Sequence, residues 1–256
     1  MLLKLLKYDF RAMWKQFSLV WGAALALALV NRFTVYGHIP LAGENTSSLM
    51  TLTFGAVLAA MFVIAVMFVI QRFSNGLLGD EGYLMHTLPV RPWELVASKL
   101  ICGAVTWIGC GVVAILSPVF MLPWNLPDLL YLPFWQNVFK GILKHPDVLV
   151  LILELCLMIV SFIVQFIAAI YLAVSIGHLF PRFRRLTGVA AFIGLYVLLV
   201  NVYDRVFSSH PVQLLLDMTT ATTYSSMLTA IAVMLIPAAV FLAIVCWILE
   251  NKLNLE

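Results

Sequence analysis

The sequence predicts an all-α polytopic membrane protein, a single transmembrane domain over residues 1–256 with six transmembrane helices. Two observations lead to this prediction. The composition is 63% hydrophobic and only 11% charged, which leaves too little polar surface for a soluble globule. Long apolar segments also alternate with shorter polar ones, and about 20 apolar residues suffice to cross a hydrocarbon core about 30 Å thick.

The chain opens with an amphipathic segment over residues 1–17. Its basic residues recur at intervals of three and four, which places them on one helix face, with apolar residues on the opposite face. We expect an N-terminal helix in the membrane interface, its basic face toward lipid phosphates. The alternative is the start of a signal peptide with Leu19 to Val30 as its apolar region. The basic residues are Lys4, Lys7, Arg11 and Lys15.

Six apolar segments follow, and each is long enough to be a transmembrane helix. The second is the clearest, because it carries no charged residue over its whole length. After the fifth, a stretch rich in threonine and serine over residues 204–226 could form a short outer or re-entrant helix. The predicted spans cover about residues 18–36, 49–70, 100–122, 148–176, 186–203 and 227–249.

The basic residues predict the orientation of the chain. With six spans, eleven of them fall on the side of both termini and four on the other side. Cytoplasmic loops carry the excess of lysine and arginine, so we expect both termini in the cytoplasm. The eleven are Lys4, Lys7, Arg11, Lys15, Arg72, Arg91, Lys99, Arg182, Arg184, Arg185 and Lys252; the four are Arg32, Lys140, Lys144 and Arg205.

Three of these residues, Arg182, Arg184 and Arg185, form a compact basic turn between the fourth and fifth spans. A membrane-surface anchor that binds lipid phosphate is the commoner role for such a turn. Contact with a partner protein is the alternative.

The fourth span carries three polar side chains, Glu154, Ser161 and Gln165. Such groups line pathways in some membrane proteins and join helices in others, and both interpretations stay open. The position of Glu154 near the outer end favours a carboxylate that reaches the interface. Gln165 lies deeper, where an unpaired amide is costly, so it should have a hydrogen-bond partner.

The sequence contains no familiar catalytic, nucleotide-binding or metal-binding motif. It has no G-x-x-x-x-G-K-[ST], H-E-x-x-H or G-x-S-x-G pattern, so we assign no catalytic residue. The four cysteines lie singly in apolar segments, and His86 and His178 stand alone, which predicts no metal site. The basic residues form no extended patch, so nucleic acid is not an expected partner.

A predicted polar hairpin over residues 71–99, QRFSNGLLGDEGYLMHTLPVRPWELVASK, separates the second and third spans. Asp80 and Glu81 suit the first turn of a short helix that ends before Pro89, and Pro92 suits the first turn of a second helix. The short helix would present apolar side chains beside two carboxylates, which suits a docking surface; a solvated loop is the alternative. These apolar side chains are Tyr83, Leu84 and Leu88.

The hairpin resembles the segment after the second span of bacterial ABC-type exporter permeases, the type-2 ABC export family. The resemblance rests on the glycine-acidic-glycine-tyrosine start, on Thr87-Leu88-Pro89 and on Ser98-Lys99; the basic opening and Asn251-Lys252-Leu253-Asn254 are weaker parts of it. It implies a cytoplasmic coupling helix in a groove of a separate ATPase subunit. The residues that would couple to the ATPase are Asp80, Glu81, Tyr83, Leu84, His86, Thr87, Leu88 and Pro89.

The resemblance also implies a permease subunit that forms a translocation pathway, as a homodimer or heterodimer, in the bacterial cytoplasmic membrane. Its partners would be ABC ATPase subunits, a second permease subunit and membrane lipids. ATP and magnesium would bind in the partner ATPase, with no cofactor in this chain. The alternatives are a membrane scaffold or assembly protein without transport and an intramembrane enzyme whose site is assembled from distant helices.

Overall fold

The computed structural model describes residues 2–36, 44–78, 92–121, 146–207 and 220–251, and within them the chain is helical with no strand. A short π-helical turn, η1 (Ser74–Leu78), follows the second long helix, and a 3-10 turn, η2 (Pro181–Phe183), precedes the fifth. The six long helices are α1 (Leu2–Tyr36), α2 (Glu44–Phe73), α4 (Pro92–Met121), α7 (Pro146–His178), α8 (Arg184–Phe207) and α10 (Thr220–Asn251).

All six long helices are long and apolar enough to cross a membrane, which confirms the predicted fold class. The fourth apolar segment, Val148–His178, and the sixth, Met227–Asn251, start where the sequence predicts. The second and third differ, because they reach further into the predicted hairpin. They run over Thr51–Leu77 and Pro92–Pro118.

The helices flanking the hairpin therefore supply part of it. α2 continues to Phe73 and η1 to Leu78, and α4 begins at Pro92, as the sequence predicts. Proline suits this first position because the nitrogens of a first helical turn have no intrahelical carbonyl to bond. The predicted coupling helix lies within residues 79–91, outside the described residues.

The predicted separate interfacial helix over residues 1–17 differs from the structure. A single helix runs from Leu2 to Tyr36, so the basic opening and the first span are continuous. Part of the apolar face packs against α2 and α4, with Met13 and Phe17 each 1% exposed; its position in the membrane interface stays a prediction. The physical reason is that no proline interrupts the segment and that its buried face continues, through Ala24 and Ala28, into the span.

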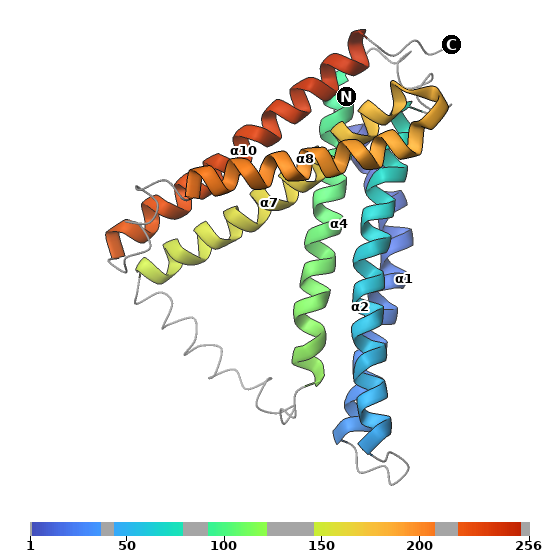
Figure 1. The fold of residues 1–256 in the computed structure, drawn as a ribbon. Helices are drawn as coiled ribbons and strands as arrows, with labels where there is room; N and C mark the ends of the chain where they lie inside the picture. The colour runs from blue at the N-terminus through green and yellow to red at the C-terminus, as the bar shows by residue number, and fades with distance from the viewer. Residues whose placement is uncertain (1, 37–43, 79–91, 122–145, 208–219, 252–256) are drawn as a thin grey trace.

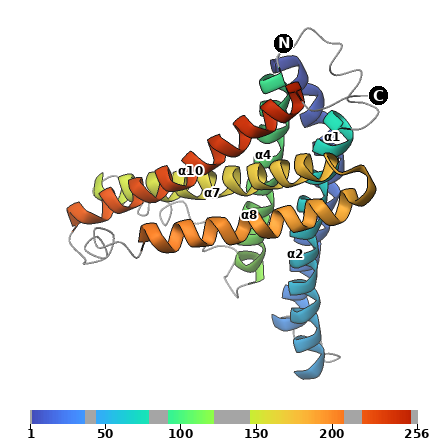
Figure 2. The ribbon, with the colours of Figure 1, turned by 45° about the horizontal axis from the view of Figure 1, so that its top comes forward.

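The helices form two groups (Figures 1 and 2). The first helix group, α1, α2 and α4, runs side by side, and the second, α7, α8 and α10, leaves it at an angle. The groups meet where α1 begins, α2 ends and α4 begins, and α7 and α10 end there too (Figure 1). We call this place the junction end.

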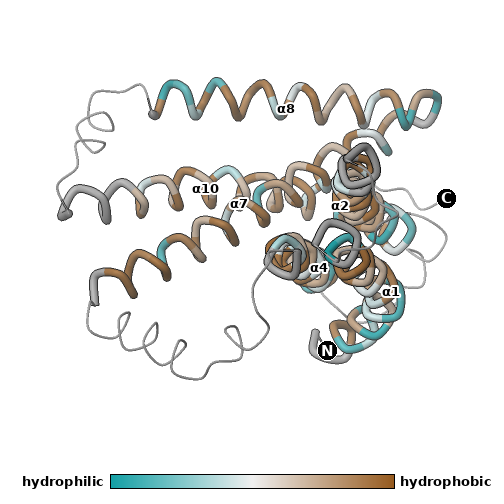
Figure 3. The backbone as a smooth tube through the Cα atoms, turned by 90° about the horizontal axis from the view of Figure 1, so that it is seen from below, coloured by the Kyte–Doolittle hydropathy of each residue, from teal (hydrophilic) through white to brown (hydrophobic). Residues whose placement is uncertain are grey.

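Two clusters of buried apolar side chains hold this arrangement. One joins the three helices of the first group around Met13, Phe17 and Met61. The other lies at the junction end, where the Phe73 ring stacks on the Tyr171 ring with centroids 4.2 Å apart. Most residues of the second group are hydrophobic (Figure 3), and many of its large apolar side chains are exposed, as expected for helices surrounded by lipid.

Candidate functional site

The base of the hairpin contains a cluster of buried charged side chains. Asp9 of α1 accepts hydrogen bonds from Lys99 of α4, whose Nζ lies 2.8 Å from Oδ1 and 3.0 Å from Oδ2. The Arg72 guanidinium, from the end of α2, also donates to Oδ1. One carboxylate therefore joins three helices, including the last turn of α2 and the first turns of α4, at the two ends of the hairpin. We call Asp9, Arg72 and Lys99 the charge cluster.

The charge cluster is largely removed from solvent. The side chains of Asp9 and Lys99 are 5% and 3% exposed, and that of Arg72 is 29% exposed. Two cations and one carboxylate leave a formal charge of +1. Removing one partner of such a buried pair costs about 3–5 kcal/mol, because the remaining charge is left without compensation. The cluster therefore fixes the spacing of α1, α2 and α4 at the junction end.

Sequence reasoning missed this cluster. It counted Lys99 and Arg72 as bases at the cytoplasmic surface and did not consider Asp9. One signal was available: Asp9 occupies the same helix face as Met13 and Phe17, four and eight residues later, and that face is buried. An acidic residue on such a face needs a cationic partner from another helix.

The π-helical turn η1 completes the base of the hairpin. Its Gly76 is buried against the Lys99 side chain, and a Cβ atom there would lie 3.4 Å from Lys99 Cε. Ser74 Oγ lies 3.3 Å from Nε2 of His178, the last residue of α7. His178 in turn has its Nδ1 2.6 Å from an Arg184 nitrogen. The segment that leads into the hairpin therefore contacts both helix groups.

The structure describes only some of the remaining predicted site residues. The coupling residues between Asp80 and Pro89 lie outside the described residues. Lys7, Arg11 and Lys15 are exposed along α1, and the Lys4 side chain is not among those described. Arg182, Arg184 and Arg185 are exposed at the start of α8, where the Arg182 guanidinium lies 5.8 Å from the centroid of the Phe183 ring.

Glu154, Ser161 and Gln165 share one buried face of α7. Ser161 donates to the carbonyl of Leu157 at 2.7 Å, and Gln165 accepts a hydrogen bond from the Tyr203 hydroxyl of α8, as expected for a deep amide. Glu154 is 5% exposed and its Oε2 has no partner among the described residues. This burial differs from the interfacial exposure that we expected for Glu154.

No group of three or more potential metal ligands occurs among the described residues. Comparison with known protein families, curated proteins and solved structures finds no match to this chain. The features that bear on function are therefore the six spans, the charge cluster and the sequence of the hairpin that the cluster anchors.

Proposed function

We propose that this chain is the permease subunit of an ATP-driven ABC exporter, coupled through residues 80–89 to a separate ATPase subunit. The support is the resemblance of the hairpin sequence to the coupling segment of that family, together with the buried charge cluster at the base of the hairpin. In this proposal, two permease subunits, identical or related, form the pathway in the bacterial cytoplasmic membrane. Both termini and the hairpin are cytoplasmic, and ATP and magnesium bind in the ATPase.

The charge cluster provides a route by which movement of the hairpin would reach the transmembrane helices. A segment that receives movement from another protein transmits it only if it is held firmly by the helices that must move. Arg72 lies at the start of the hairpin and Lys99 at its end, and Asp9 bonds both. A displacement of the hairpin would therefore carry α2 and α4 together, and α1 with them.

Leu84→Asp tests the docking step. The change would put a charge into a desolvated contact, which is costly without a partner. We expect the full chain to reach the membrane in normal amounts, but the ATPase that co-purifies with the wild type to be lost, together with its ATP hydrolysis. Asn75→Asp is the matched control, since Asn75 lies in η1, is exposed, and gains the same charge.

Two results would contradict the proposal. One is a wild-type chain that carries no ATPase when purified under mild conditions from its native membrane. The other is a Leu84→Asp variant that retains its ATPase and its ATP hydrolysis at wild-type levels. A scaffold protein would give the first result, and an intramembrane enzyme would in addition be active alone.

A further inference from the structure

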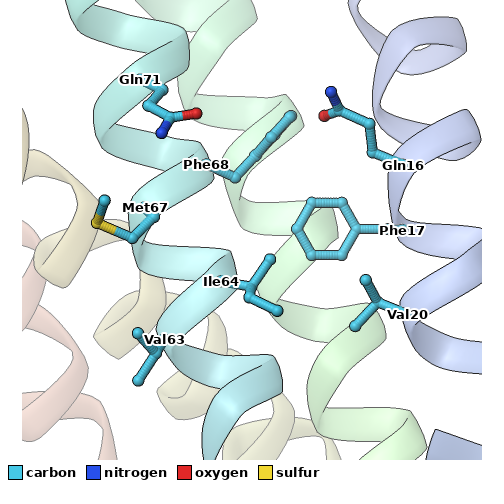
Figure 4. A pocket seen from close by; sticks show the side chains of 8 residues that line it. All are labelled: Gln16, Phe17, Val20, Val63, Ile64, Met67, Phe68 and Gln71. Atoms are coloured by element: carbon cyan, nitrogen blue, oxygen red, sulfur yellow. The ribbon is translucent and has the colours of Figure 1, made fainter. Parts of the chain in front are cut away.

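A groove lies along the first helix group, between α1 and α2 (Figure 4). Its volume is about 360 Å³ and most of its lining is apolar. Phe17 and Phe68 meet edge to face inside it, with ring centroids 5.0 Å apart. Ile64 lies beside them and is 46% exposed. The groove is thus an open apolar trough in a part of the chain that crosses a membrane.

One end of the groove is polar. Gln16 of α1 and Gln71 of α2 lie there on opposite sides (Figure 4). Gln71 directly precedes Arg72, so this end points toward the charge cluster. Two amides on neighbouring helices are costly in hydrocarbon unless polar groups satisfy them.

Exposed aromatic residues place this end near the membrane surface. Tyr8 and Trp14 of α1 are 73% and 63% exposed, and tyrosine and tryptophan concentrate at the level of lipid headgroups. Gln16 follows Trp14 by two residues. The polar end of the groove therefore lies close to the headgroups, and its apolar length extends into the acyl region.

We propose that the groove binds one anionic phospholipid. One acyl chain lies along the exposed side chains of Val63, Ile64 and Met67. The phosphate lies beside Gln16 and Gln71, on the side of the charge cluster. The charge cluster supplies the preference for an anion, because its formal charge is +1 and Arg72 is its most exposed member. Arginine has five N–H donors, so Arg72 can bond a phosphate without releasing Asp9. The proposal rests on the membrane fold and does not require transport.

Native mass spectrometry of the full chain in detergent tests the proposal, with phosphatidylglycerol and phosphatidylcholine of identical acyl chains as probes. We expect one retained phosphatidylglycerol and about fivefold weaker retention of phosphatidylcholine, the effect of roughly one basic residue near an anionic headgroup. Ile64→Trp should fill the groove and abolish retention of phosphatidylglycerol. Leu52→Trp is the matched control on the same helix, because Leu52 is 70% exposed and lies outside the groove.

A second variant, Gln71→Leu, tests the polar end without altering the charge cluster, and should reduce retention of phosphatidylglycerol more than that of phosphatidylcholine. Equal retention of the two lipids by the wild type would overturn the headgroup assignment. Wild-type retention by a folded Ile64→Trp variant would overturn the groove itself. Conversion of a dimer to a monomer by Ile64→Trp, with lipid retention unchanged, would show that a second copy occupies the groove and would likewise overturn the proposal.

Discussion

In the first helix group the buried charged side chains pair across three helices, whereas the buried polar side chains of the second group follow one face of α7. Asp9, Arg72 and Lys99 tie α1, α2 and α4 at the junction end. In the second group, Ser161 bonds within its own helix and Gln165 bonds Tyr203 of α8. Charged side chains therefore link the helices that carry the hairpin, whereas a hydrogen bond between neutral side chains links α7 to α8.

The largest effect should follow from Asp9→Asn. It removes the only carboxylate that the described residues place within bonding distance of Lys99 and Arg72. Two cations would remain, one almost fully buried, at a cost of about 3–5 kcal/mol. We expect a lower thermal unfolding midpoint in detergent, measured by tryptophan fluorescence. Lys15→Met, on the exposed face of α1, should change stability by less than about 0.5 kcal/mol.

A double-mutant cycle sharpens this test. If Asp9 and Lys99 act as a pair, Asp9→Asn combined with Lys99→Met should cost less than the sum of the single changes, by about 0.5–3 kcal/mol. Strictly additive effects would show that the two side chains do not interact.

The sequence predicts the spans much better than the cluster that joins them. Apolar length alone identifies the fourth span to within two residues: the structure has Val148–His178 and the sequence predicts 148–176. The agreement is close because a helix must be long and apolar to cross a hydrocarbon core. The charge cluster depends on contacts between residues 63 and 90 positions apart. The periodicity of residues within one segment cannot show that Asp9 pairs with residues on two other helices. The sequence therefore places Lys99 on the cytoplasmic side, at the entry to the third span, but does not predict its burial.

A second comparison within the first helix group concerns two glycines of α4. A Cβ atom on Gly109 would lie 2.3 Å from the Trp21 ring of α1, whereas one on Gly111 would meet nothing within 4 Å. Gly109→Ala should cost about 1–3 kcal/mol by overpacking. Gly111→Ala should stabilise by about 0.4–1 kcal/mol, because alanine limits the unfolded chain. Equal unfolding midpoints for the two variants would contradict the close packing of α1 on α4.

The smallest effect should come from the second group. Tyr203→Phe removes the hydrogen bond to Gln165, and such bonds between membrane helices contribute about 0.6 kcal/mol on average. Tyr196→Phe is the control, since Tyr196 is 62% exposed on the same helix. If Tyr203→Phe lowered stability as much as Asp9→Asn does, the two helix groups would not differ in how their polar contacts stabilise them.

The proposed function requires that α1, α2 and α4 move as one body when a partner ATPase moves the hairpin. Double electron–electron resonance tests this requirement in the proposed complex of this chain with an ATPase. The spin labels are placed at exposed positions, Leu52 of α2, Ile115 of α4 and Leu153 of α7. We predict that trapping the ATP-bound state leaves the Leu52–Ile115 distance unchanged and shifts the Leu52–Leu153 distance. A shift between Leu52 and Ile115 as large as that between Leu52 and Leu153 would contradict the account.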